Sequence, residues 1–96
     1  MHHFHLKNGS LHVENLSVAS LAKKYGTPLY VYSQSTLEDH FDRLDKALKP
    51  VDHVICFATK SNSNLSVLRT FAQKGSGFDV TSAGELYRVL KAGANP

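Results

Sequence analysis

The stretch His53-Val-Ile-Cys-Phe-Ala-Thr-Lys-Ser-Asn-Ser-Asn64 decides the fold of this chain. Its largely apolar first part predicts a buried β-strand over 53–59, and Lys60 follows at once. In α/β proteins, reactive groups stand just beyond the carboxyl ends of such strands. The amine of Lys60 could form a Schiff base with a carbonyl cofactor, which hints at pyridoxal phosphate (PLP) chemistry. The plain alternative is a solvated lysine at a strand end.

On both sides of this stretch, strand patterns alternate with helix patterns. Strands are predicted over 29–33, 53–59 and 77–82. Helices are predicted to begin at Ser35, Leu65 and Ser82 and to end before Pro50, Gly75 and Gly93. Two of these starts, Ser35-Thr-Leu-Glu38 and Ser82-Ala-Gly-Glu85, have the capping-box pattern. The alternation predicts βαβ units, a parallel sheet and an α/β fold.

The first fifteen residues predict a β-hairpin with Asn8-Gly9 as its two-residue turn. This turn sets the cross-strand pairs Leu6–Leu11, Phe4–Val13, His5–His12 and His3–Glu14. The last two pairs could offer ligands to a metal ion, but no pattern of supporting groups accompanies them. We therefore expect a solvated polar face and no metal site. From Ser17 the period becomes helical, and Gly26 and Pro28 mark the end of a short helix.

Composition excludes several classes of function. With 96 residues the chain forms one small domain at most, and its net charge of +3 is mild. No stripe of basic and aromatic residues suggests a nucleic-acid partner, and no apolar run is long enough to span a bilayer. The single cysteine, Cys56, rules out an internal disulfide and fits a reducing compartment. We expect a cytoplasmic globular protein.

Asp79 is the second candidate site residue. It lies in the predicted strand that follows Lys60, and parallel strands joined by one helical crossover are usually neighbours. The two side chains could then approach one site beyond the strand ends. A carboxylate there favours a protonated amine or imine, and protonation makes a Schiff base electrophilic. Asp79 could equally be an ordinary ion-pair or turn residue.

Three segments resemble the diaminopimelate decarboxylase family. Phe57-Ala-Thr-Lys-Ser-Asn-Ser-Asn64 is similar to its PLP-lysine motif, usually Tyr-Ala-x-Lys-Ala-Asn-x-Asn. Gly75-Ser-Gly-Phe-Asp-Val-Thr-Ser-Ala-Gly-Glu-Leu-Tyr-Arg88 resembles the next motif, commonly Gly-x-Gly-x-Asp-Val-Val-Ser-Gly-Gly-Glu-Leu, and Leu21–Tyr32 matches the typical opening. The departures are Phe57 for Tyr, Ser61 for Ala and Ala83 for Gly. None of them removes the amine or the carboxylate.

The resemblance implies the alanine-racemase-like fold, a PLP-binding (β/α)₈ barrel followed by a β-rich domain. Residues 1–15 would form a hairpin that joins the β-rich domain, and residues 16–96 would supply the first three βα units of the barrel. Lys60 would carry PLP, Asp79 would lie beside the cofactor, and Glu85 would help to fix the polar network of the site. Glu85 also has the simpler explanation of a helix cap.

The implied activity is PLP-dependent decarboxylation of meso-diaminopimelate to L-lysine and CO₂, by a cytoplasmic homodimer. Such a barrel takes about 250 residues, so we expect an N-terminal piece of a longer enzyme that is inactive and poorly folded alone. Alternatives are an ornithine- or arginine-type decarboxylase, an alanine racemase, a non-catalytic relative that acts as a binding protein, or a plain α/β interaction module.

Overall fold

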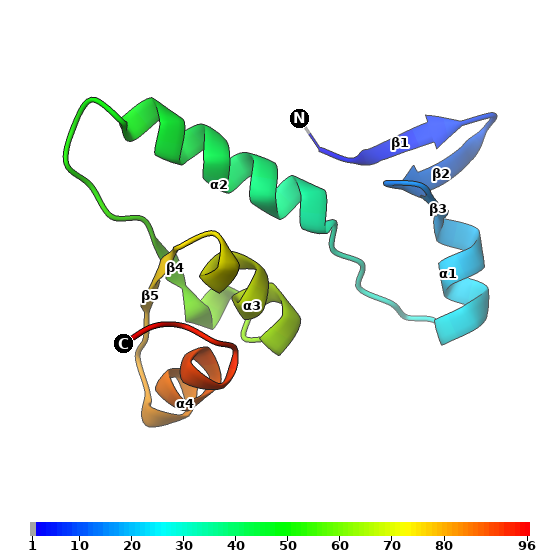
Figure 1. The fold of residues 1–96 in the computed structure, drawn as a ribbon. Helices are drawn as coiled ribbons and strands as arrows, with labels where there is room; N and C mark the ends of the chain where they lie inside the picture. Colours follow the sequence, from blue (N-terminus) through cyan, green and yellow to red (C-terminus); the bar gives the residue numbers. More distant parts are fainter. Residues whose placement is uncertain (1) are drawn as a thin grey trace. The chain divides into compact units, whose positions relative to one another are not determined.

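The computed structural model describes residues 2–96, which form two compact units, one up to Thr36 and the other Leu37–Pro96. The first unit holds β1 (Phe4–Lys7), β2 (Ser10–Val13), β3 (Leu16–Ser17) and α1 (Val18–Tyr25) (Figure 1). Next comes α2 (Gln34–Leu48), in whose first turn the division between the units falls. The second unit continues with β4 (Cys56–Ala58), the 3₁₀ turn η1 (Thr59–Ser61), α3 (Leu65–Gln73), β5 (Gly77–Asp79) and α4 (Ala83–Lys91). The chain is α/β, as predicted.

The predicted hairpin is confirmed, including its register. β1 and β2 pair antiparallel with Leu6 opposite Leu11, Phe4 opposite Val13 and His5 opposite His12. Asn8 and Gly9 have φ angles of 52° and 77°, the positive values that a type I′ turn requires at both central positions. The short strand β3, which the sequence analysis did not predict, pairs antiparallel with β2.

The strand predicted over 29–33 is wrong. These residues form no strand, and Tyr30 and Tyr32 remain 87% and 57% exposed. β-branched and aromatic residues favour a strand only where a neighbouring strand accepts their hydrogen bonds. Within the described chain no strand pairs with this segment.

The predicted capping box at Ser35 is also misplaced, because α2 begins at Gln34 and Ser33 caps it. The Ser33 hydroxyl accepts a hydrogen bond from the backbone amide of Thr36 at 3.1 Å. Glu14, at the end of β2, accepts hydrogen bonds from the Ser35 amide at 2.9 Å and from the Ser33 hydroxyl at 2.8 Å. The bond from the Ser35 backbone amide, and to a smaller extent the bond from the Ser33 hydroxyl, lower the pKa of Glu14 below its ordinary value. A carboxylate from the hairpin thus stabilises the positive end of the helix.

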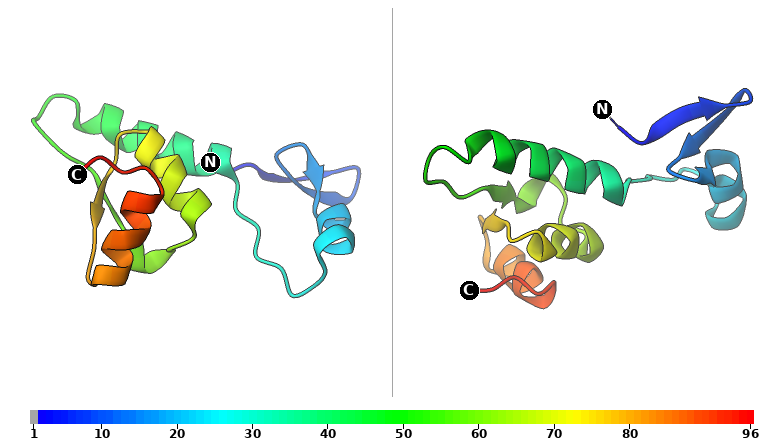
Figure 2. Two further views of the ribbon diagram at one scale, coloured as in Figure 1. Left: turned by 60° about the horizontal axis from the view of Figure 1, so that its bottom comes forward. Right: turned by 45° about the horizontal axis from the view of Figure 1, so that its top comes forward.

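In the second unit, β4 and β5 pair in parallel, with Cys56 opposite Gly77, Phe57 opposite Phe78 and Ala58 opposite Asp79. The sheet has two strands where three were predicted, and both strands are shorter than expected. The βα order after β4 is as predicted. α3 and α4 lie side by side, as both views in Figure 2 show.

Aromatic and aliphatic packing joins the helices to one face of this sheet. Leu68, Val89 and Ala92 are buried, and Phe57 and Phe78 pack against them. The Phe57 ring stacks on Phe71 of α3 at 4.2 Å between ring centroids, and Phe71 in turn contacts Phe41 of α2 at 6.3 Å. The odd-numbered side of β5 therefore faces away from α3 and α4.

The ends of α3 and α4 follow from two glycines that the sequence analysis singled out. Gly75 and Gly93 have φ angles of 81° and 102°. The Gly75 amide bonds the Ala72 carbonyl at 3.0 Å and the Ser76 amide bonds the Phe71 carbonyl at 3.1 Å. The same pattern recurs one helix later, and both are Schellman motifs. No helix in the described residues is long and apolar enough to cross a membrane.

Candidate active site

Lys60 lies in η1, two residues beyond the end of β4. The turn that carries it is closed by its own polar residues: the Ser61 hydroxyl donates to the Ala58 carbonyl at 2.7 Å, and the Asn62 amide donates to the Thr59 carbonyl at 3.2 Å. Lys60 itself is exposed. Its amine has no hydrogen bond or ion pair with any described residue. The structure thus puts a free primary amine at the end of a strand.

The buried side chain of Thr59 attaches this turn to the interior of the unit. It is completely buried, and its hydroxyl finds no hydrogen-bond partner among the described residues. A buried hydroxyl without a partner costs about 1–3 kcal/mol. Packing at Thr59 therefore holds the backbone beside Lys60 at some expense in stability.

Asp79 is the last residue of β5 and lies opposite Ala58 in the parallel register. The predicted neighbourhood of the two strands is confirmed. Because Phe78 packs toward the helices, the alternation of a strand turns Asp79 to the other face, where it is exposed. Among residues 2–96 no hydrogen bond or ion pair joins Asp79 to Lys60. The two groups lie at the same edge of the sheet without direct contact.

Glu85 lies in the first turn of α4, which Ser82 caps as predicted: the Ser82 hydroxyl accepts from the Glu85 amide at 3.1 Å. The Glu85 carboxylate reaches back one residue further than a capping box requires. It accepts from the amide of Thr81 at 2.6 Å and from its hydroxyl at 3.0 Å. Glu85 thereby fixes the loop that follows Asp79.

One residue near the turn of Lys60, Arg88, was not among the predicted site residues. Arg88 of α4 donates from Nη1 to the Ser63 carbonyl at 3.3 Å, across 25 positions of sequence. Arg88 closes the second quoted motif, but no spacing in the sequence signals its bond to Ser63, because the two residues lie 25 positions apart.

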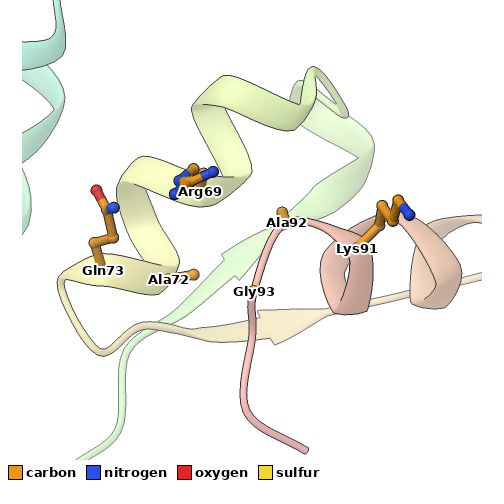
Figure 3. A pocket seen from close by; sticks show the side chains of 6 residues that line it. All are labelled: Arg69, Ala72, Gln73, Lys91, Ala92 and Gly93. Carbon is orange, nitrogen blue, oxygen red and sulfur yellow. The ribbon is translucent and has the colours of Figure 1, made fainter.

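A separate hollow of about 310 Å³ lies between the last turns of α3 and α4 (Figure 3). Its lining residues are Arg69, Ala72, Gln73, Lys91, Ala92 and Gly93. Lys60 and Asp79 stand before the first turns of α3 and α4, whereas the hollow lies at the last turns of these helices. The hollow is therefore at the opposite end of the βα units and takes no part in the candidate site. No group of three or more metal-ligating side chains occurs in the described part of the chain.

Residues 34–96 match the family described as pyridoxal-dependent decarboxylase, pyridoxal binding domain. The chain belongs to this family. The match contains β4, η1, α3, β5 and α4, and so both Lys60 and Asp79.

Individual relatives are similar over almost the whole chain. It is 54% identical over 90 residues to the diaminopimelate decarboxylase of Vibrio cholerae and 50% identical over 95 residues to that of Haemophilus influenzae. Those matches cover 94% and 99% of this chain, but only 22% and 23% of the relatives. The chain thus spans about a fifth of their length.

One solved structure, the diaminopimelate decarboxylase from M. jannaschii in complex with L-lysine, has a TM-score of 0.88 and 33% identity. That match covers 93% of this chain and 22% of the solved one.

The residues present fit the cofactor that the family name implies. A primary amine without an ion pair is what condensation with an aldehyde needs. A carboxylate at the end of the paired strand favours a protonated nitrogen nearby. Lys60 and Asp79 supply these two groups. The roles of Lys60, Asp79 and Glu85 remain predictions.

Proposed function

We propose that this chain is part of a PLP-dependent enzyme that decarboxylates meso-diaminopimelate to L-lysine and CO₂. The observation that carries the proposal is the parallel register of β4 and β5, in which Ala58 lies opposite Asp79 with Lys60 two residues further on. Both residues fall within the match to a pyridoxal-binding domain. The named relatives support diaminopimelate as the substrate.

In this proposal Lys60 binds the cofactor covalently through its amine. The negative charge of the Asp79 carboxylate stabilises the protonated form of that nitrogen. Glu85 keeps the loop after Asp79 in place through its bonds to Thr81. When bound, PLP supplies an electron sink for the charge left by loss of CO₂.

The proposal extends to the domain layout. Residues 1–15 would join a β-rich domain, and residues 16–96 would contribute βα elements to a (β/α)₈ barrel. The exposure of Leu6 and Leu11, at 74% and 45%, supports a partner for the hairpin face that carries them. A homodimer in the cytoplasm is part of the same proposal and rests on the resemblance to the family.

The test uses the longest natural chain that carries residues 1–96. After incubation with PLP and reduction with borohydride, peptide mapping should find the label on Lys60, and Lys60→Arg should abolish it. A label on any other lysine would overturn the assignment. Release of CO₂ from meso-diaminopimelate, L-ornithine and L-arginine, with alanine racemisation alongside, then separates the substrate alternatives. Sedimentation of the same preparation tests the dimer.

A further inference from the structure

The segment that carries Lys60 is packed into the fold at Thr59 and closed by local bonds, but it has few hydrogen bonds to other elements. Beyond the bonds of Ser61 and Asn62, the Asn62 side chain accepts from the Asn64 amide at 3.0 Å. The Asn64 side chain caps α3 by accepting from the Ser66 amide at 2.9 Å. All of these bonds lie within nine residues, so they fix the shape of the turn, and its position depends on the packing of Thr59 and on contacts with other elements.

Arg88 connects this segment to α4 through a hydrogen bond between residues far apart in the sequence. Its Nη1 donates to the Ser63 carbonyl at 3.3 Å, and α4 contacts η1 directly. In the described chain Arg88 has no ion pair with Glu85 or Asp79, so its guanidinium is available to the backbone of this turn. The fork of five N–H donors suits a carbonyl oxygen at the edge of a loop.

The helix that bears Arg88 is itself well fixed. The next residue, Val89, is 3% exposed and belongs to the core with Leu68. One turn earlier, Glu85 holds Thr81 in the loop after β5. One helix therefore holds both loops of the candidate site, through Glu85 on the Asp79 side and through Arg88 on the Lys60 side.

We infer that Arg88 is a positioning residue for the amine of Lys60. By holding the Ser63 carbonyl, it limits the movement of the turn and keeps the Lys60 backbone at the edge of the sheet that Asp79 occupies. Lys60 then spends more of its time where a bound aldehyde can be reached. The inference rests on the proposed function, because it concerns the reaction of that amine with PLP.

The experiment compares Arg88→Gln, Arg88→Lys and the matched control Lys91→Gln in the longest natural chain with residues 1–96, stripped of cofactor. Lys91 is an exposed cation on the same helix, without a hydrogen-bond or ion-pair partner among the described residues. PLP is added, samples are reduced with borohydride over time, and the label on Lys60 is quantified by peptide mapping. The rate constant and the final amplitude are recorded separately, together with the melting temperature.

Arg88→Gln should lower the rate constant about 3- to 10-fold, which corresponds to the net contribution of one ordinary hydrogen bond. Arg88→Lys, which keeps a cationic donor, should recover part of this loss, and Lys91→Gln should match the wild type. A merely structural role would instead lower the amplitude and the melting temperature and leave the rate constant unchanged, which would overturn the inference. A wild-type rate in Arg88→Gln would also overturn it. If Lys60 is unlabelled in the wild type, the proposed function itself is wrong.

Discussion

The imidazole of His53 lies between two oxygen acceptors. Its Nδ1 is 2.9 Å from the Val51 carbonyl, and its Nε2 is 2.9 Å from Oδ1 of Asp45 in α2. Only the protonated ring can donate to both oxygens at once. The carbonyl of Val51, followed by the carboxylate of Asp45, therefore raises the pKa of His53 above its ordinary value.

This arrangement gives a prediction about pH. A raised pKa in the folded state means that the contribution of His53 to stability is complete below its unfolded pKa of about 6.5. The contribution disappears as the pH rises through the higher folded value. The Asp45→Asn variant should lower the pKa of His53 in an NMR titration and make thermal stability less dependent on pH between about 6 and 8.

Asp52→Asn is the matched control, because Asp52 is an exposed acid close in sequence that bonds no described residue. It should leave the His53 titration near that of the wild type. An Asp45→Asn titration that coincides with the wild type would mean that the contact does not persist in solution.

At the scale of single elements, the close approach of β4 and β5 explains one glycine. A Cβ atom built on Gly77 would lie 2.7 Å from Sγ of Cys56, the residue opposite it in the parallel pair. The next atoms, the Ile55 carbonyl oxygen and a Val54 methyl, would be at ordinary distances of 3.5 and 3.6 Å. The sulfur alone makes a side chain at position 77 costly.

Gly77→Ala should therefore destabilise the protein by about 1–2 kcal/mol, at the lower end of overpacking because the exposed thiol can rotate. In a Cys56→Ala background the same change should cost much less, since the obstructing sulfur is gone. Urea unfolding of the four proteins gives the coupling between the two positions as a double-mutant cycle. An equal cost of Gly77→Ala in both backgrounds would show that the backbone, and not the sulfur, opposes the side chain.

Local chemistry made much of the fold predictable. The Asn8-Gly9 turn set the hairpin register, and the glycines after α3 and α4 marked where each helix ends. The order of βα elements brought Lys60 and Asp79 to neighbouring strand ends. Each of these features depends on a few adjacent residues or on a rule of chain topology.

The features that sequence analysis missed depend on distant partners. Residues 29–33 have the composition of a strand but lack a described strand to pair with. The start of α2 depends on Glu14, nineteen positions before Ser33, and so a local capping pattern pointed to the wrong serine. The bond of Arg88 to Ser63 spans 25 positions. Such contacts depend on how distant segments pack together, and the spacing of motifs in the sequence does not reveal that packing.

At the scale of the whole molecule, the chain divides into two units, each with its own stabilising contacts. Val13 is 4% exposed in the first unit, where Glu14 also caps α2. In the second unit, Phe71 is 9% exposed and stacks on Phe57. Units that are stabilised by separate contacts are expected to open separately when local unfolding is measured.

Hydrogen exchange of two variants tests this division in the longest natural chain with residues 1–96. Phe71→Leu removes an aromatic pair worth about 1 kcal/mol, so amides of α3, β4 and β5 should exchange about fivefold faster. Glu14→Gln weakens the charged cap, by about 1 kcal/mol, and should speed exchange in the hairpin and the first turn of α2. If either variant accelerates exchange equally in both units, they open together.

The lowered pKa of Glu14 gives a further prediction, about pH. The contribution of Glu14 to the stability of the hairpin is present above the ordinary glutamate pKa of about 4.3 and is lost as the pH falls through the lower folded value. Acid should therefore lower the protection factors first in the wild-type hairpin, relative to the slower intrinsic exchange at the same pH, and Glu14→Gln should remove that response while the second unit stays protected.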